Sequence, residues 1–486
     1  MANSNKVLLN NFNRGGLADS RWSGVADSYY KLTGLDPHTT PGLLKVGQKL
    51  TKISSTTVTE FCKERVVSSN GMIYWFSSTT GKIWQQTPST NAFELIFTTT
   101  AAAGGVGCLG AIEYQGYIYW ATESRLHRIA ATGNDTAAEW TSNAALNWAT
   151  FTKTDSLFHP MLELNLVLYI GDGNLVAQVD AGVFTANALD IKTPLRVKSL
   201  GKIGVDLLVG TWVANTITQT ELIRWNTYSV SFTTSDTIPE TGINAFIPAD
   251  NFVLLQAGLA GNLYTYDGST TELYKTIPGE YTPTKYGYVY PSSSGNLNGQ
   301  LLFGMSNGTG NPCDLGVYRL ARHDRKYPFI LDFPYPISER DGTALVTTAI
   351  EIGGLAVSGF NVYVAWKRTV DGDPDTYVYG VDKLDYDNKL DGAYFETRIM
   401  NVNREELSTM ENYVLNYYQI PTSCNITLAY DKNYAGYVNM TAVKDSQRNT
   451  ISSEEGVEAS VLSVKATFTT SANTGPSIES GAVLLK

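Results

Sequence analysis

The sequence predicts an all-β protein, and three observations carry this prediction. Charged residues make up 17% of the 486 residues, whereas an average soluble protein has about 25%. The shortage falls on residue types that populate exposed helix faces, while glycine (43) and tyrosine (29), which favour turns and strands, are abundant. In addition, apolar runs typical of strands recur along the chain at a nearly constant step.

The recurring unit is a turn led by glycine or asparagine, an apolar run, a polar tight turn and a second strand-like run. The apolar runs begin at Met72, Tyr117, Leu166, Leu207, Phe252, Leu301 and Phe360. Two of the partner runs, Gly-Asn-Leu-Val-Ala-Gln-Val-Asp at 173–180 and Gly-Asn-Leu-Tyr-Thr-Tyr-Asp at 261–267, nearly repeat each other. This similarity indicates an internal repeat rather than a chance succession of strands.

A step of roughly 40–60 residues that holds four short strands is the size of one propeller blade. The sequence therefore predicts a β-propeller of about seven blades over residues 55–392, and six or eight blades stay open because the longest step can hide an insertion. A large β-sandwich or barrel is the alternative, since its strands also recur with regular turn signals.

The two ends of the chain have a different character. In residues 1–54, aromatic residues and glycines follow neither a helical nor an alternating period, which predicts an extended N-terminal arm that docks on the propeller or on a neighbouring subunit. In residues 393–486, alternating strand-like runs predict a separate C-terminal β-sandwich.

The net charge of −10 gives the chain no overall basic footprint, which argues against sequence-specific DNA binding. No stretch resembles a signal peptide or approaches the roughly 18 apolar residues of a membrane span, so a soluble, unexported product is expected. The cysteines Cys62, Cys108, Cys313 and Cys424 are widely scattered, which favours reduced, partly buried thiols over a disulfide or metal framework.

No catalytic constellation is apparent. None of the histidines His38, His127, His159 and His323 has the spacing of a zinc ligand, and nucleophile-elbow, phosphate-loop and dinucleotide motifs are missing. We therefore expect no enzyme activity, no catalytic, metal or cofactor-binding residues, and no cofactor.

Three segments have features of a functional site. Ser77–Trp84 resembles the Ser-x-Asp-x-Gly-x-x-Trp turn of sialidase blades, but Thr79 replaces its aspartate, so an ordinary hairpin turn with a packing tryptophan is favoured. Asp371, Asp373, Asp375 and Asp382 have the spacing of calcium ligands, but Thr376 stands where the loop needs glycine, which favours a solvated turn. The basic run 319–326 can face an acidic partner or nucleic acid, although a solvated connection is the simpler interpretation.

The aromatic residues lie mostly within the strand-like runs, where we expect them to fill the space between blades. A sugar-stacking surface formed by a few of them is the alternative interpretation.

Several short motifs resemble virion proteins of tailed bacteriophages. These are Gly-Gly-Leu-Ala-Asp-Ser at 15–20, Gly34-Leu-Asp-x-His-x-x-Pro41-Gly42-Leu-Leu-Lys-Val at 34–46, and the segment 463–479 near the C-terminus. Together with the order of arm, propeller and sandwich, they look like the tail hub or nozzle proteins of short-tailed phages. That resemblance implies a non-enzymatic structural protein and transfers no site residue.

The resemblance further implies a homo-oligomeric, six-fold ring in the phage tail, assembled in the host cytoplasm. Such a ring contacts the portal, the adaptor and other tail or fibre proteins and surrounds the DNA exit channel. A net charge of −10 suits passing DNA, because contacts to phosphates release counterions and raise affinity. Two alternatives stay open: a receptor-binding tail fibre or lectin-like module, and a propeller-type glycosidase acting on host surface polysaccharide.

Overall fold

The structure is a computed structural model that describes residues 5–9, 12–22, 24, 27–54, 56–100, 107–154, 156–213, 219–249, 251–307, 310, 312–339, 349–370, 373–401, 408–453 and 456–485. Its regular elements are strands apart from two short helices, α1 (Phe12–Gly15) and α2 (Ala137–Asn143). Within these residues no helix has the length and apolar character needed to cross a membrane. The all-β class that the sequence predicts is confirmed.

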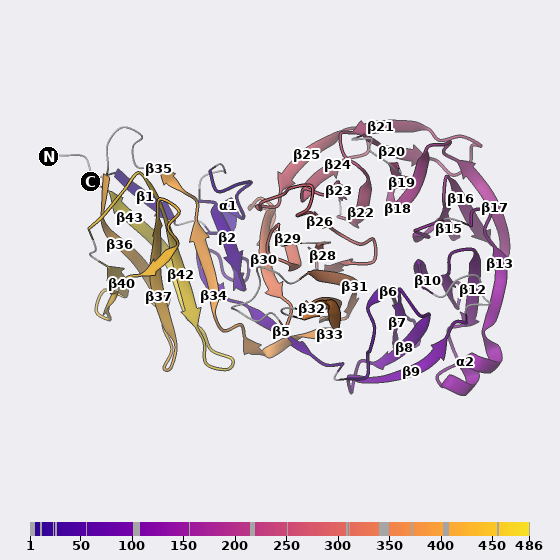
Figure 1. The fold of residues 1–486 in the computed structure, drawn as a ribbon, viewed down its shortest axis with the longest axis horizontal. Helices are drawn as coiled ribbons and strands as arrows, with labels where there is room; N and C mark the ends of the chain where they lie inside the picture. The colour runs from indigo at the N-terminus through magenta and orange to yellow at the C-terminus, as the bar shows by residue number, and fades with distance from the viewer. Residues whose placement is uncertain are drawn as a thin grey trace.

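Most strands form the predicted β-propeller, a ring of four-stranded antiparallel sheets (Figure 1). Five of these blades each take four strands that follow one another in the chain. They are β6 (Cys62–Val67), β7 (Ile73–Ser77), β8 (Lys82–Thr87) and β9 (Ala92–Thr98); β10 (Gly110–Tyr114), β11 (Tyr117–Ala121), β12 (Arg125–Ala130) and β13 (Ala145–Thr150); β14 (Met161–Leu164), β15 (Val167–Asp172), β16 (Leu175–Asp180) and β17 (Val183–Asp190); β18 (Leu195–Ile203), β19 (Asp206–Val213), β20 (Thr220–Trp225) and β21 (Thr234–Ile238); β22 (Ile243–Pro248), β23 (Val253–Ala257), β24 (Asn262–Tyr266) and β25 (Thr271–Thr276).

A sixth separate blade closes the ring, because it combines one strand from before the first blade with three strands from the end of the propeller segment. It consists of β31 (Ile350–Ser358), β32 (Asn361–Val370), β33 (Asp373–Lys389) and β5 (Gln48–Lys52). Between this blade and β22–β25 lie β26 (Gly287–Tyr288), β27 (Ser294–Leu297), β28 (Gln300–Asn307), β29 (Gly316–Ala321) and β30 (Ile330–Pro336). Strands β27–β30 are not a separate sheet, because pairing through β30 continues them into an eleven-stranded sheet.

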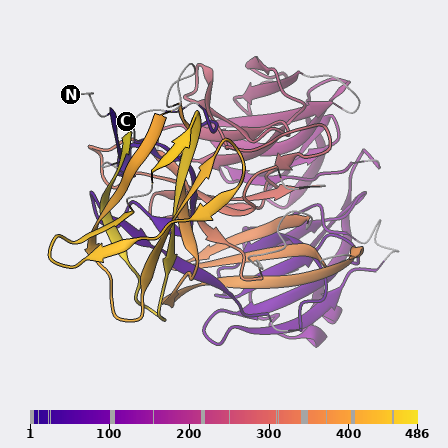
Figure 2. The ribbon, with the colours of Figure 1, turned by 60° about the vertical axis from the view of Figure 1, so that its left-hand side comes forward.

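The remaining strands lie in an eight-stranded sheet and in the part of the eleven-stranded sheet that extends beyond β30, away from the ring (Figure 2). The eleven-stranded sheet runs from β30 through β2 (Tyr29–Thr33), β34 (Ala393–Thr397), β42 (Val461–Thr469), β37 (Asn425–Lys432) and β38 (Tyr437–Asn439), with β35 (Met400–Asn401) on β42. The eight-stranded sheet contains β1 (Asn5–Leu9), β3 (Leu35–Asp36), β4 (Leu44–Val46), β36 (Ser408–Gln419), β39 (Val443–Asp445), β40 (Thr450–Ser453), β41 (Val457–Ala459) and β43 (Ser477–Leu485).

The strands of the N-terminal segment are distributed over both parts of the molecule. β1 and β4 pair with β43, β2 lies between β30 and β34, and β5 completes the blade of β31–β33. The segment predicted as an extended arm therefore supplies strands to both parts, and the propeller includes β5, which precedes the expected boundary at residue 55. The physical reason is that β5 covers an edge of β33 that is otherwise unpaired.

Burial explains the repeating sequence pattern. The second strand of a blade packs on both faces against neighbouring blades, so β7 and β23 are buried along their whole lengths. The fourth strand lies at the circumference, and β17 alternates between exposed and covered residues. Buried aromatic side chains, including Trp75 and Trp120, fill the space between blades.

Glycines allow the innermost strands to approach one another closely. A Cβ atom on Gly110 of β10 would lie 1.8 Å from the carbonyl oxygen of His159, and one on Gly353 of β31 would lie 2.1 Å from that of Cys62. Only glycine fits at such contacts without moving the backbone. Neighbouring blades therefore pack closely against each other around the centre of the ring.

Candidate functional site

The turn that resembles a sialidase blade is a hairpin between β7 and β8, and Trp84 is buried in the packing below it. A carboxylate is present, but it comes from Glu60 outside the turn. Glu60 accepts hydrogen bonds from the hydroxyls of Ser77 at 2.6 Å and Thr79 at 3.3 Å, and it pairs with Lys82 at 2.7 Å. Because its oxygens are occupied in holding the turn, Glu60 has a structural position rather than a catalytic one.

Replacing Glu60 with glutamine is expected to lower the free energy of unfolding by about 1–3 kcal/mol at neutral pH, because the turn hydroxyls and Lys82 lose a charged acceptor. Burial opposes ionisation of the carboxyl, but Lys82 and the hydroxyls outweigh it and hold the pKa of Glu60 below its ordinary value. This stabilisation is complete above the ordinary pKa and is lost as the pH falls through the lowered one.

Urea unfolding of both proteins between about pH 3 and pH 7 checks this prediction, since the difference between them should shrink below about pH 4. Glu94→Gln, at an exposed site on β9 of the same blade, is the matched control. A difference that stays constant over the whole pH range would contradict the assignment.

Of the aspartates with calcium-like spacing, those that lie in the described residues do not form a metal site. Asp382 is buried and accepts hydrogen bonds from the Trp366 indole N–H and from both the amide and the hydroxyl of Ser338, each at 2.7 Å. Asp373 stabilises its own turn by accepting from Thr376 at 2.6 Å. Asp371 lies outside the described residues, and within those residues no cluster of His, Cys, Asp and Glu side chains has the arrangement of a metal site.

The basic run 319–326 is divided between the interior and the surface. Arg319 is buried and forms ion pairs with Asp332 at 2.6 Å and with Asp36 at 2.9 Å. Arg322 lies over the Phe329 ring at 4.6 Å from its centroid. The run therefore does not form one continuous basic surface, and its strongest cation holds β29, β30 and β3 together.

All four cysteines are free thiols in the structure. Cys62 and Cys108 are buried, and burial raises the pKa of both thiols. Burial also raises the pKa of Cys313, to about 12. Thiols with raised pKa values are poor nucleophiles at neutral pH, so these three have the environment of packing residues.

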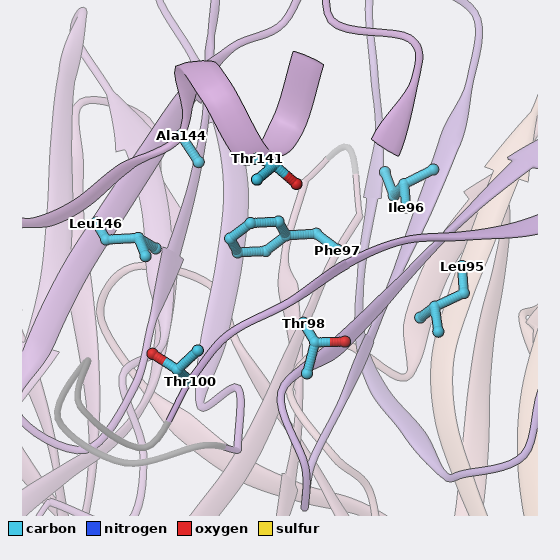
Figure 3. Close-up of a pocket in the computed structure, with 8 residues that line it drawn as sticks. All are labelled: Leu95, Ile96, Phe97, Thr98, Thr100, Thr141, Ala144 and Leu146. Carbon is cyan, nitrogen blue, oxygen red and sulfur yellow. The ribbon is translucent and has the colours of Figure 1, made fainter. Parts of the chain in front are cut away.

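A surface hollow of about 440 Å³ lies between α2 and β9 (Figure 3). Its lining is apolar or hydroxylic, with Phe97 near the centre and Leu95 and Leu146 on either side. Threonine hydroxyls are the polar side-chain groups there, and no acid, base or thiol lines the hollow. This hollow therefore offers no chemistry for catalysis.

Charged and aromatic side chains from several blades meet at one end of the ring's centre. We call this set the axial cluster; it consists of Lys63, Phe158, Lys198, Trp212 and Tyr290. The Lys63 Nζ lies 5.0 Å from the centroid of the Phe158 ring and 4.8 Å from that of Tyr290. The Lys198 Nζ lies 5.6 Å from the same Phe158 ring, which meets Trp212 edge-on at 6.1 Å.

The two contacts of Lys63 cross the centre of the propeller, whereas Lys198 and Trp212 belong to the blade next to β14–β17. Lys63 belongs to β6, Phe158 precedes β14, and Tyr290 precedes β27, so each contact passes over an intervening blade. Figure 1 shows β6, β10, β18, β22 and β31 as the strands nearest to this centre. The contact between Lys63 and Tyr290 thus depends on closure of the ring.

The electrostatics of the axial cluster differ from those of the whole chain. Burial lowers the pKa of Lys63, and burial together with the charge of Lys63 lowers the pKa of Lys198 to about 8. On the same strand as Lys63, burial raises the pKa of Glu64 to about 7. Arg65 donates to the carbonyl oxygens of Leu355 at 2.8 Å and Ser294 at 3.3 Å. A chain of net charge −10 therefore places two lysines at its axis, with Glu64 and Arg65 on the same strand as Lys63.

Acetylation of the Lys198 amine should show that its pKa is lowered. At pH 8 about half of the Lys198 amines are expected to be uncharged, against under about 1% of an ordinary lysine amine. Peptide mapping of acetylation across pH 6–10 should therefore give a midpoint near pH 8 for Lys198. In Lys63→Met the midpoint should move upward, because a neighbouring positive charge is removed. A midpoint at the ordinary lysine value in the wild-type chain would contradict the assignment.

The sequence did not reveal the axial cluster, because its members are scattered from residue 63 to residue 290 and share no spacing. The sugar-stacking alternative for a few aromatic residues was the only relevant signal, and it did not identify which ones. The two lysines were not singled out, since lysine is ordinarily a surface residue.

Comparison with known proteins gives a likeness of fold alone. No family model and no curated protein matches the sequence. The extracellular domain of a hybrid two-component system from B. thetaiotaomicron aligns at 13% identity and a TM-score of 0.46, over 83% of this chain and 47% of that one. Virginiamycin B lyase from Staphylococcus aureus aligns at 11% identity and a TM-score of 0.44, over 68% of this chain and 97% of the lyase. A streptogramin B lyase aligns at 10% identity and a TM-score of 0.44, over 69% of this chain and 97% of that one.

Proposed function

We propose that the chain is a non-enzymatic structural protein of a phage virion, a tail hub or nozzle component that forms a ring around the DNA exit channel. One observation carries this proposal: the N-terminal segment supplies strands to both the propeller and the outer sheets. Residues from β2, β5, β30 and both outer sheets belong to one continuous hydrophobic cluster. Such a chain is suited to holding neighbours at fixed positions, as an assembly role requires.

We further infer that β27–β30 serve as a seventh blade and that the two outer sheets form a β-sandwich. β27 contacts both β22 and β31, as a blade between them must. Buried side chains of both outer sheets, among them Phe395, Phe468, Tyr413 and Val483, belong to the same cluster. This packing supports two apolar sheet faces in contact.

Apolar side chains at hairpin ends support an assembly role. Leu166 in the β14–β15 turn is 73% exposed, Val205 in the β18–β19 turn 64%, and Val230 between β20 and β21 95%. The Asn165 amide donates to the carbonyl oxygen of Val205 at 3.2 Å, so turns of adjacent blades are tied together. We take these exposed apolar residues, two of which lie on the turns that are tied together, as part of the proposed contact surface between subunits.

In the proposed virion, identical copies form a ring, with six as the expected number, that meets the portal, the adaptor and other tail or fibre proteins after assembly in the host cytoplasm. Closed rings require heterologous contacts, in which one face of a subunit meets a different face of the next. DNA passes through without sequence-specific binding, in keeping with the net charge of −10.

Electron microscopy of the virion tests the proposal. A ring of this protein on the tail axis is the expected result, whereas a peripheral appendage or absence from the particle would overturn it. With the purified chain, mass photometry should detect a ring-sized oligomer that Val230→Asp dissociates. Ser231→Asp, which places the same charge on a neighbouring exposed polar residue, is the matched control.

A further inference from the structure

The axial cluster places two ammonium groups against one aromatic ring. Lys63 and Lys198 come from different blades, yet both Nζ atoms lie within 6 Å of the Phe158 ring centroid, at 5.0 and 5.6 Å. The charge of Lys63 acts on Lys198, as one of the causes that perturb its ionisation. Two like charges held close together in a poorly hydrated place repel each other strongly.

In the described part of the chain these two charges are compensated only in part, since Glu64 and Glu351 act on Lys63 without forming an ion pair with it. Neither lysine has a carboxylate within ion-pair distance there, although Lys52, Lys82 and Lys367 each have one. Glu351, the carboxylate beside Tyr290, accepts that tyrosine's hydroxyl at 2.6 Å and pairs with Lys367 instead. An anion from outside would therefore relieve a repulsion that the protein leaves in place.

The aromatic side chains around the two lysines also indicate what kind of molecule carries the anionic group. Phe158, Trp212 and Tyr290 are half-buried and present aromatic surface next to the ammonium groups. Aromatic surface covers the apolar C–H faces of a sugar ring, while a bare inorganic ion gains nothing from it. Both lysines and all three rings keep some exposed surface, so a ligand can reach them from solvent.

We propose that the axial cluster binds a carboxylated sugar, with the carboxylate between Lys63 and Lys198 and the sugar ring against Phe158. The site is non-covalent and needs no metal or cofactor. It does not rest on the proposed tail function, because binding belongs to a single closed propeller. It also gives an acidic chain a way to hold an acidic saccharide, since the two lysines at the axis contrast with the overall charge of −10.

Isothermal titration of the purified full-length chain with glucuronate tests the proposal. We expect saturable binding that weakens with added salt, at least tenfold weaker binding of glucose, and at least tenfold loss in Lys63→Met and Lys198→Met. Lys202→Met, at an exposed position on the same strand as Lys198, should bind as the wild type does. Absence of saturable glucuronate binding, or equal binding by both cluster variants and the wild type, would overturn the proposal.

Two further measurements test whether the sugar ring contributes to binding and whether the ligand covers Lys198. Phe158→Leu should weaken glucuronate binding and leave phosphate binding unchanged; if phosphate binds as tightly as glucuronate and Phe158→Leu affects neither, the sugar assignment is wrong. In the wild-type chain, which needs no variant to fold, glucuronate should slow acetylation of Lys198 while glucose does not. Unchanged acetylation at saturating glucuronate would likewise overturn the proposal.

Discussion

Replacing Arg319 with methionine is expected to lower the free energy of unfolding by about 3–5 kcal/mol, because it leaves the buried Asp332 and the partly buried Asp36 without their cation. The guanidinium donates to Asp332 through Nε at 3.1 Å and Nη2 at 2.6 Å, and Nη2 also lies 2.9 Å from Asp36. Arg319 and Asp332 are almost completely removed from water. The network joins β29 and β30 to β3, so its loss should loosen the propeller from the outer sheets.

Urea unfolding of Arg319→Met measures the effect, and Arg322→Met on the same basic run is the control. Arg322 packs over Phe329 at the surface, so its loss should cost under about 1 kcal/mol. In Arg319→Met/Asp332→Leu part of the lost stability should return, because an apolar pair replaces an unpaired buried charge. A loss in Arg319→Met no larger than that in Arg322→Met would show that the network is not a determinant of stability.

The sequence predicted the propeller because one strand of each unit has a distinctive composition. The apolar runs that begin at Met72, Tyr117 and Leu166 correspond to β7, β11 and β15, and each is the second strand of its blade. This strand is covered on both faces by neighbouring blades, so it must be apolar throughout rather than alternating. The apolar runs therefore recur in the sequence because the same buried position recurs in each blade.

Features that depend on contacts between distant segments could not be predicted in the same way. β5 is five residues long, and its pairing with β33 joins positions more than 300 residues apart. The Glu60 carboxylate replaces the missing aspartate of the β7–β8 turn from outside that motif. The axial cluster likewise brings Lys63, Phe158 and Lys198 together from segments that are far apart in the sequence. None of these arrangements leaves a local spacing in the sequence.

Truncating Leu50 to alanine is expected to cost about 2–5 kcal/mol, because it removes a buried side chain from the strand that completes the propeller. Leu50 lies opposite Leu384 in the β5–β33 register and is 3% exposed. It belongs to the hydrophobic cluster that the last blade shares with the outer sheets. The cavity should therefore weaken the closure of the ring and, through the shared cluster, the outer sheets as well.

Hydrogen exchange distinguishes this local effect from general destabilisation. In Leu50→Ala, amides of β33 should lose protection before those of β19, which lies in a blade on the far side of the ring. Val67→Ala, at a partly exposed position at the end of β6, is the matched control and should change stability by under about 0.5 kcal/mol. If β33 stays as well protected as β19 while the whole protein is destabilised, β5 is not the strand that secures the ring. If β33 opens first, ring closure depends on the N-terminal segment, and the contact of Lys63 with Tyr290, which crosses that closure, should be lost with it.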